Sequence, residues 1–157
     1  MSLNVPSGQH VNKVPFTGIL ANCDTPSTRP PGGASGHQVI LSSAVAERCL
    51  SSLLGMGVNT APNMREHAPQ RKIGLIATAN VVNGDLEVAG FLYGKNFPAE
   101  IAQLRRQQGQ LGMSFEISDV IIRDDSAPVW DIQHCTFTGC AILAKTSAAF
   151  QQTCIAL

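Results

Sequence analysis

The stretch from Lys72 to Tyr93, KIGLIATANVVNGDLEVAGFLY, gives the clearest indication of the fold. Its two parts, Lys72–Val82 and Leu86–Tyr93, have the composition of β-strands, and Asn83-Gly84 lies between them. This dipeptide accepts the positive φ angles of a tight type I′ turn. The stretch therefore predicts a β-hairpin.

Further strands are predicted on both sides of this hairpin. Val14–Cys23 and Gln38–Leu41 precede it, and Met113–Ile122 and Val129–Leu143 follow it. The last two are separated by a polar turn at 123–128. The sum is about six to seven strands, which is typical of a small β-rich domain.

Two helices are also expected. One begins after Ser42 or Ser43, which can cap it, and ends at Gly55. The other begins at Pro98, a residue that suits the first turn of a helix. A short helical turn is expected around 147–152.

Length and composition predict one domain. The chain has 157 residues, of which 44% are hydrophobic, enough for a single core over 14–157. Residues 1–13 are expected to form a flexible N-terminal arm. Residues 24–36 are rich in Pro and Gly and predict a long loop, which is either a flap over the substrate or a plain connection.

Charge and cysteine content restrict the function classes. Lys+Arg and Asp+Glu are equal at 11 each, and no basic cluster exceeds a pair, so direct nucleic-acid binding is not expected. The sequence has no long apolar run for a membrane span and no apolar signal segment, which predicts a cytoplasmic location. The five cysteines form no Cys-x-x-Cys pair, so neither disulfides nor a zinc ribbon is predicted, and no cofactor is expected.

His67 and Ser114 are the candidate catalytic pair. A serine hydroxyl is a weak nucleophile at neutral pH and needs a base such as histidine to take its proton. Strand alternation places Ser114 and Glu116 on one polar face of their strand. If the next strand pairs with it, His134 could project from the same face.

Several short motifs occur in a defined order from about Val14 to Leu157. They are Gly18-Ile19-Leu20, Asp24-Thr25-Pro26-Ser27, Pro30-Pro31-Gly32-Gly33, Leu53-Leu54-Gly55-Met56, His67 with Lys72-Ile73-Gly74, Gly90-Phe91-Leu92-Tyr93, Gly112-Met113-Ser114-Phe115-Glu116, and Thr136-Phe137-Thr138-Gly139 with Ala141-Ile142-Leu143. Together they resemble the Caudovirus prohead serine protease family, the tailed-phage capsid maturation proteases, which are similar to herpesvirus assemblins.

The resemblance implies an α+β fold, in which a mainly antiparallel β-barrel is wrapped by two or more helices. It implies a serine endopeptidase with Ser114 as nucleophile and His67 as general base and then general acid. His134 holds the position of the third catalytic residue, with Glu116 and Glu66 as alternatives.

The resemblance also implies a biological setting. The substrates would be the phage scaffold and the extensions of the major capsid protein, cleaved inside the assembling prohead, and the enzyme could process itself. A homodimer or higher homo-oligomer is the implied state.

Other interpretations stay open at this point. The same fold could serve as a non-catalytic head assembly or scaffold protein. A small-ester hydrolase is disfavoured because the serine lacks a Gly-x-Ser-x-Gly elbow. Cys135 adjoins His134 but faces the opposite way on a strand, and a metal site from His67, His134 and Cys140 lacks the spacing of zinc motifs.

Overall fold

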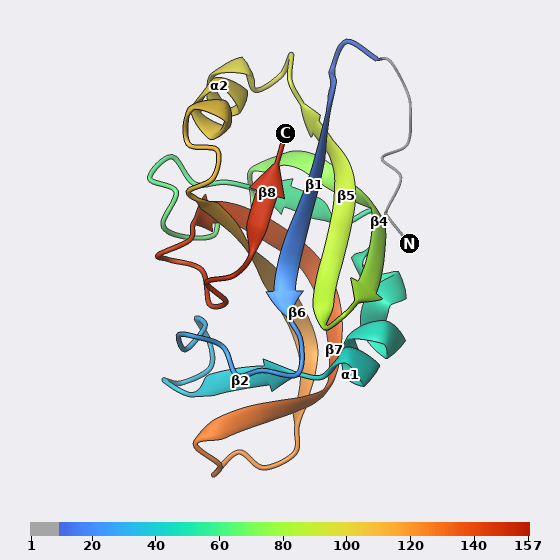
Figure 1. The fold of residues 1–157 in the computed structure, drawn as a ribbon, viewed down its shortest axis with the longest axis vertical. Coiled ribbons are helices and arrows are strands. Elements are labelled where there is room, and N and C mark those ends of the chain that lie inside the picture. The colour runs from blue at the N-terminus through green and yellow to red at the C-terminus, as the bar shows by residue number, and fades with distance from the viewer. Residues whose placement is uncertain (1–9) are drawn as a thin grey trace.

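The structure, a computed structural model, describes residues 10–157. The expected arm at 1–13 therefore lies largely outside the described residues, and Lys13 already belongs to the first strand. The polypeptide forms eight strands, two α-helices and one short 3-10 helix over the described range (Figure 1). In chain order these are β1 (Lys13–Asn22), β2 (Gln38–Leu41), α1 (Ser43–Cys49), η1 (Leu50–Leu53), β3 (Gly57–Asn59), β4 (Lys72–Val82), β5 (Asp85–Tyr93), α2 (Pro98–Arg106), β6 (Leu111–Ile122), β7 (Val129–Ala144) and β8 (Cys154–Ala156).

All eight strands belong to one mixed sheet. Its order is β2-β7-β3-β4-β5-β1-β8, and β6 pairs with β7. Most pairs are antiparallel, but β2 and β3 run parallel to β7. Because Gly139 of β7 pairs with both Gly57 and Glu116, β3 and β6 lie on opposite edges of β7.

The sheet curls into an incomplete barrel. At the end of the curl, the backbone N–H of Met113 in β6 donates a hydrogen bond of 3.1 Å to Thr153 Oγ1. Thr153 is the residue directly before β8, so this bond joins β6 to the start of β8. Figure 1 shows β8 beside β1, with the long β6 and β7 crossing behind them. A curled sheet encloses its own core, so the strands that carry the site have a packed interior behind them.

The core fills the inside of this curl. Its largest fully buried side chains come from six of the eight strands and from η1 and α2: Phe16, Phe137, Leu20, Leu41, Leu53, Ile73, Ile76, Leu86, Leu92, Leu104, Leu111 and Met113. Side chains packed at this density leave the backbone of β6 and β7 little freedom to shift. That rigidity is useful for a site that these strands position.

The helices form as their sequence predicts. Ser42 caps α1 by accepting a hydrogen bond from the Val45 N–H at 3.2 Å, and Gly55 follows η1 with a φ of 80°. In α2, Pro98 lies in the first turn, and Ile101 and Leu104 face the core. The first helix is shorter than expected because its last turn tightens into η1.

The predicted α+β class and its mostly antiparallel sheet are confirmed, and two details differ. The hairpin forms as expected, with positive φ at Asn83 and Gly84. The short strands β3 and β8 were not predicted, since three residues are too few to show a periodic pattern. Residues 147–152 form turns instead of a helix.

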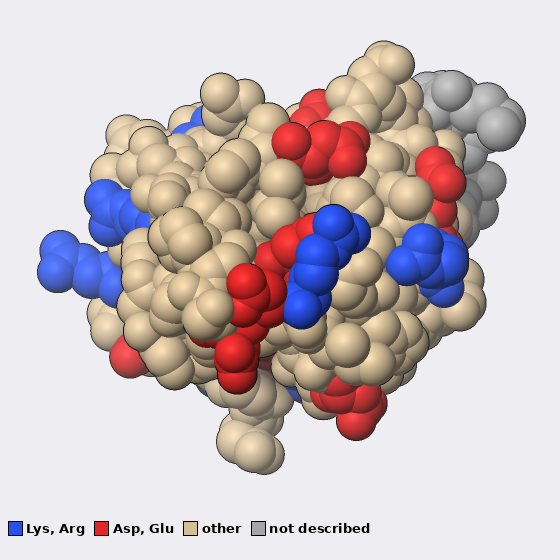
Figure 2. Space-filling model, turned by 90° about the horizontal axis from the view of Figure 1, so that it is seen from below, with Lys and Arg blue, Asp and Glu red and all other residues tan. Residues whose placement is uncertain are grey.

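Charged side chains are spread over the surface. Figure 2 shows acidic and basic groups interspersed on the face that it presents, without a continuous basic area. No helix within residues 10–157 has the length and apolar character needed to cross a membrane.

Candidate active site

Strands β6 and β7 place Ser114 and Glu116 on one wall of a cavity of about 760 Å³. Ser114 pairs with Ala141 and Glu116 pairs with Gly139 in an unbroken part of the register. Both side chains are half-buried and both line the cavity. The strand alternation predicted from sequence therefore brings the serine and the carboxylate together on one face.

The loop between β3 and β4 carries His67 to the same cavity. Two hydrogen bonds fix this loop. The backbone N–H of Ala68 donates to Asn59 Oδ1 at 2.7 Å, and the N–H of Ala144 in β7 donates to the Met64 carbonyl at 2.8 Å. The position of His67 is thus set by β3 and by its neighbour β7.

His67 and Glu116 form the central contact of the site. His67 Nδ1 lies 3.0 Å from Glu116 Oε1. An ionised carboxylate can only accept a hydrogen bond, so Nδ1 must carry the proton. In the neutral imidazole this leaves Nε2 with a free lone pair, which is the form a general base requires.

Three donors keep Glu116 ionised. Asn59 Nδ2 lies 2.5 Å from Oε1, beside the His67 contact, and Lys72 Nζ lies 3.2 Å from Oε2. Burial alone raises the pKa of this carboxyl, but the hydrogen bonds from His67, Asn59 and Lys72, with the charge of Lys72, outweigh it and lower the pKa from 4.5 to about 2. Glu116 is therefore a carboxylate at neutral pH.

Two glycines make room for this arrangement. A Cβ on Gly139 would lie 2.5 Å from Glu116 Oε2 and 2.9 Å from Lys72 Nζ. A Cβ on Gly57 would collide with the aliphatic part of the Lys72 side chain. Gly139 of the Thr-Phe-Thr-Gly motif is needed here because a side chain would displace the carboxylate and its lysine.

The acid stability of the protein should depend on Glu116. Its folded pKa is about 2 against 4.5 unfolded, so its contribution is fully present above about pH 5 and is lost as the pH falls toward 2. We expect the stability difference between the wild type and Glu116→Gln to shrink by about 2 kcal/mol between pH 7 and pH 3. Urea unfolding at pH 7, 5, 4 and 3 measures it, and a difference that does not change with pH would contradict the assignment.

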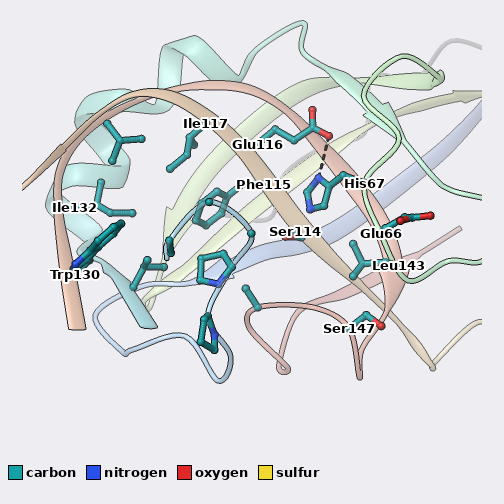
Figure 3. Close-up of a pocket in the computed structure, with 18 of the residues that line it drawn as sticks. Glu66, His67, Ser114, Phe115, Glu116, Ile117, Trp130, Ile132, Leu143 and Ser147 are labelled. Atoms are coloured by element: carbon teal, nitrogen blue, oxygen red, sulfur yellow. Dashed lines mark hydrogen bonds and ion pairs between the residues drawn. The ribbon is translucent and has the colours of Figure 1, made fainter. Parts of the chain in front are cut away.

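Ser114 lies on the other side of the His67 ring from Glu116. In Figure 3 the imidazole lies between the labelled Glu116 and Ser114, with its dashed contact to the carboxylate. Within residues 10–157, the Ser114 hydroxyl has no hydrogen-bond partner among the side chains. Ser114, His67 and Glu116 thus line one cavity, and the serine hydroxyl is not engaged by another side chain there.

The structure places His134 away from this group. On β7 it pairs with Ile121, seven residues from the Ala141 position that lies opposite Ser114. Its Nδ1 faces Cys49 Sγ of α1 at 3.9 Å, and the residue is exposed. The strands are neighbours as expected, but the antiparallel register separates His134 from His67.

Glu66, the other acidic alternative, lines the cavity but is held by a different group. Its Oε1 accepts a hydrogen bond from Asn63 Nδ2 at 2.8 Å. Glu116 is the carboxylate that contacts His67.

Asn59 and Lys72 are site residues that the sequence interpretation did not assign. Lys72 belongs to the Lys72-Ile73-Gly74 motif, which contributes to the family resemblance but indicates no catalytic or structural role for the lysine. Asn59 is fully buried in the three-residue strand β3 and also donates to the Cys140 carbonyl at 3.0 Å. In the sequence Asn59 stands between Val58 and Thr60, and this context gives no signal for its role.

The cysteines do not compete for the nucleophile role. Burial, and next the neighbouring Cys49, raises the pKa of Cys135 to about 12, so its reactive thiolate is scarce at neutral pH. All five thiols are free, and Cys154 is the one that is not fully buried. Among the described residues, no group of three or more His, Cys, Asp or Glu side chains could hold a metal ion.

The Pro-Gly loop forms another wall of the cavity. Residues 30–34 are among its lining residues. The start of the loop is anchored, because Thr28 and Arg29 donate from their backbone to the Ala149 carbonyl at 2.7 and 3.1 Å. Ser27 is fully buried and pairs with Val39 through both its backbone and its hydroxyl.

Comparison with known proteins gives a distant structural similarity. No protein family and no curated protein matches the sequence. Among solved structures, the chain is similar to the KSHV protease, a herpesvirus enzyme crystallised with a hexapeptide phosphonate inhibitor, with a TM-score of 0.45 and 12% identity. The match covers 83% of this chain and 59% of that one, so the chain spans about three fifths of the length of the viral protease.

Proposed function

We propose that this protein is a serine endopeptidase in which Ser114 is the nucleophile, His67 the base and Glu116 the third catalytic residue. The observation that carries the proposal is the 3.0 Å contact from His67 Nδ1 to Glu116 Oε1 in the cavity that Ser114 also lines. It has the order of a hydrolase triad, with carboxylate, imidazole and hydroxyl in sequence.

The reaction would be acyl transfer. Ser114 Oγ attacks the peptide carbonyl while His67 Nε2 takes its proton, and the tetrahedral oxyanion collapses as the protonated His67 returns that proton to the leaving amine. Water then attacks the acyl-enzyme with His67 again as base. Glu116 supports each step by stabilising the positive charge that His67 carries in between.

We further propose that its substrates are the phage scaffold and the extensions of the major capsid protein. Support comes from the ordered motifs between Gly18 and Leu143, which resemble the prohead protease family. On this proposal the enzyme acts inside the assembling prohead in the host cytoplasm, as a homodimer or larger homo-oligomer. Cleavage of its own chain would follow the same chemistry.

Covalent labelling tests the proposed chemistry directly. A fluorophosphonate should add one phosphonyl group to the intact protein, and peptide mapping should place it on Ser114, because only an activated serine displaces fluoride at a useful rate. Co-expression with the scaffold and major capsid protein should yield fragments on a gel. An unlabelled, folded protein that leaves both partners intact would favour the non-catalytic assembly role instead.

A further inference from the structure

The cavity has two chemically different ends. His67, Glu116, Glu66 and Arg65 make the end near Ser114 polar. The opposite end, which we call the apolar arm, is lined by Ile117, Val120, Ile122, Trp130, Ile132 and Val39. Figure 3 shows Trp130 and Ile132 at the far side of the cavity from His67 and Glu66.

Trp130 presents only apolar surface to the cavity. Its indole N–H donates to the Asp125 carbonyl at 3.0 Å, so its polar atom is already satisfied. The ring stacks on His37 with centroids 4.6 Å apart and an angle of 15°. His37 Nδ1 lies 2.9 Å from the Ala127 carbonyl and holds the stack in place. The arm is therefore formed before anything binds to it.

Two more apolar side chains of the arm come from an irregular part of β6. Asp119 has a positive φ of 51°, and the register with β7 shifts between Ser118 and Ile121. Val120, which is 42% exposed, and Ile122 both line the cavity. Ile121, between them, is 57% exposed and is not a lining residue.

We propose that the apolar arm binds a large apolar side chain of the peptide substrate, a few residues from the bond that Ser114 attacks. The arm is continuous with the candidate active site, and Ile117 and Val120 lie three and six residues from Ser114 along β6. An extended peptide has the same rise per residue as a strand, so its side chains at about three to six positions from the cleaved bond reach the arm. This inference rests on the proposed endopeptidase function and specifies its substrate class.

Burial of such a side chain should strengthen binding. Removing a leucine or phenylalanine side chain from water favours the complex by an amount equal to about a 10- to 100-fold change in affinity. A carboxylate or hydroxyl at the same place would lose its hydration without gaining a partner. The arm therefore also selects against polar residues at that position.

Trp130 gives a direct signal for this test because it is the only tryptophan in the chain. The Ser114→Ala protein, which cannot form an acyl-enzyme, is titrated with tryptophan-free nonapeptide pools. Each pool is random except for one position fixed as Leu, Phe, Ser or Asp. We expect the Leu and Phe pools to change Trp130 emission at concentrations at least about 10-fold lower than those the Ser and Asp pools require.

Two matched variants decide whether the arm is responsible. Val120→Asp places a charge in the arm, whereas Ile121→Asp places the same charge on the neighbouring exposed residue outside it. The preference for Leu and Phe should disappear in the first variant and persist in the second. Equal behaviour of the two variants, or pools that bind alike, would overturn the inference.

This experiment separates two possible failures. If fluorophosphonate labels Ser114 but the pools bind without preference, the endopeptidase function stands and the apolar arm does not select substrate. If the pools discriminate but Ser114 is inert, the arm binds apolar peptide segments and the catalytic proposal is wrong.

Discussion

Replacement of Ser114 with alanine is expected to lower kcat/KM for peptide cleavage by about 10³-fold or more. The reason is that Ser114 is the lining hydroxyl beside His67, whereas Ser147 lies farther from the imidazole and no cysteine lines the cavity (Figure 3). The fold should remain, because the half-buried Ser114 hydroxyl makes no side-chain hydrogen bond in residues 10–157. Cleavage of a co-expressed scaffold, followed by intact mass, measures the loss.

Ser118→Ala is the matched control for this variant. Ser118 lies on the same strand and the same side of the alternation, but it is exposed and its hydroxyl donates to Asp119 at 3.0 Å. Its removal should change the rate less than about twofold, as surface substitutions usually do. Continued cleavage by the Ser114→Ala protein would exclude Ser114 as the nucleophile.

The second large effect is expected for Glu116→Gln, which should lower kcat by about 10³- to 10⁴-fold. A glutamine can still accept the proton of His67 Nδ1, but it lacks the negative charge that stabilises the imidazolium in the transition state. The substitution also leaves Lys72 without its carboxylate, so some loss of stability accompanies it. Circular dichroism at the assay temperature confirms that the variant is folded before its rate is measured.

His134→Ala, compared with Glu116→Gln, decides which residue is the third catalytic group. His134 faces Cys49 at 3.9 Å and does not line the cavity, so its removal should leave kcat within about twofold. Should a Glu116→Gln preparation fail to fold, Glu116→Asp keeps the charge but shortens the reach, and an intermediate rate is expected. Loss of activity in His134→Ala with full activity in Glu116→Gln would restore the role that the sequence resemblance gave to His134.

Much of the architecture could be predicted because it depends on local patterns. The hairpin at Asn83-Gly84, the Ser42 cap and the Pro98 helix start each follow from the conformational preferences of a few adjacent residues. The short strands β3 and β8 could not be predicted in this way. They are strands because β3 forms backbone hydrogen bonds with β7, and β8 forms them with β1. A segment of three residues contains no pattern that predicts such a partner.

The candidate site also has some features that local sequence patterns predict and others that only tertiary contacts decide. The chemistry of Ser114, His67 and Glu116, and the strand face that Ser114 and Glu116 share, are properties of residue type and alternation, which can be read along the chain. The contact of His67 with Glu116 instead of His134, and the hydrogen bonds of Asn59 and Lys72 to Glu116, follow only from the register of β6 on β7 and from the loop beside β3. Such contacts join residues that are 44 to 57 positions apart, as in Lys72–Glu116 and Asn59–Glu116. A shift of two residues in the register would keep every local pattern and change every partner.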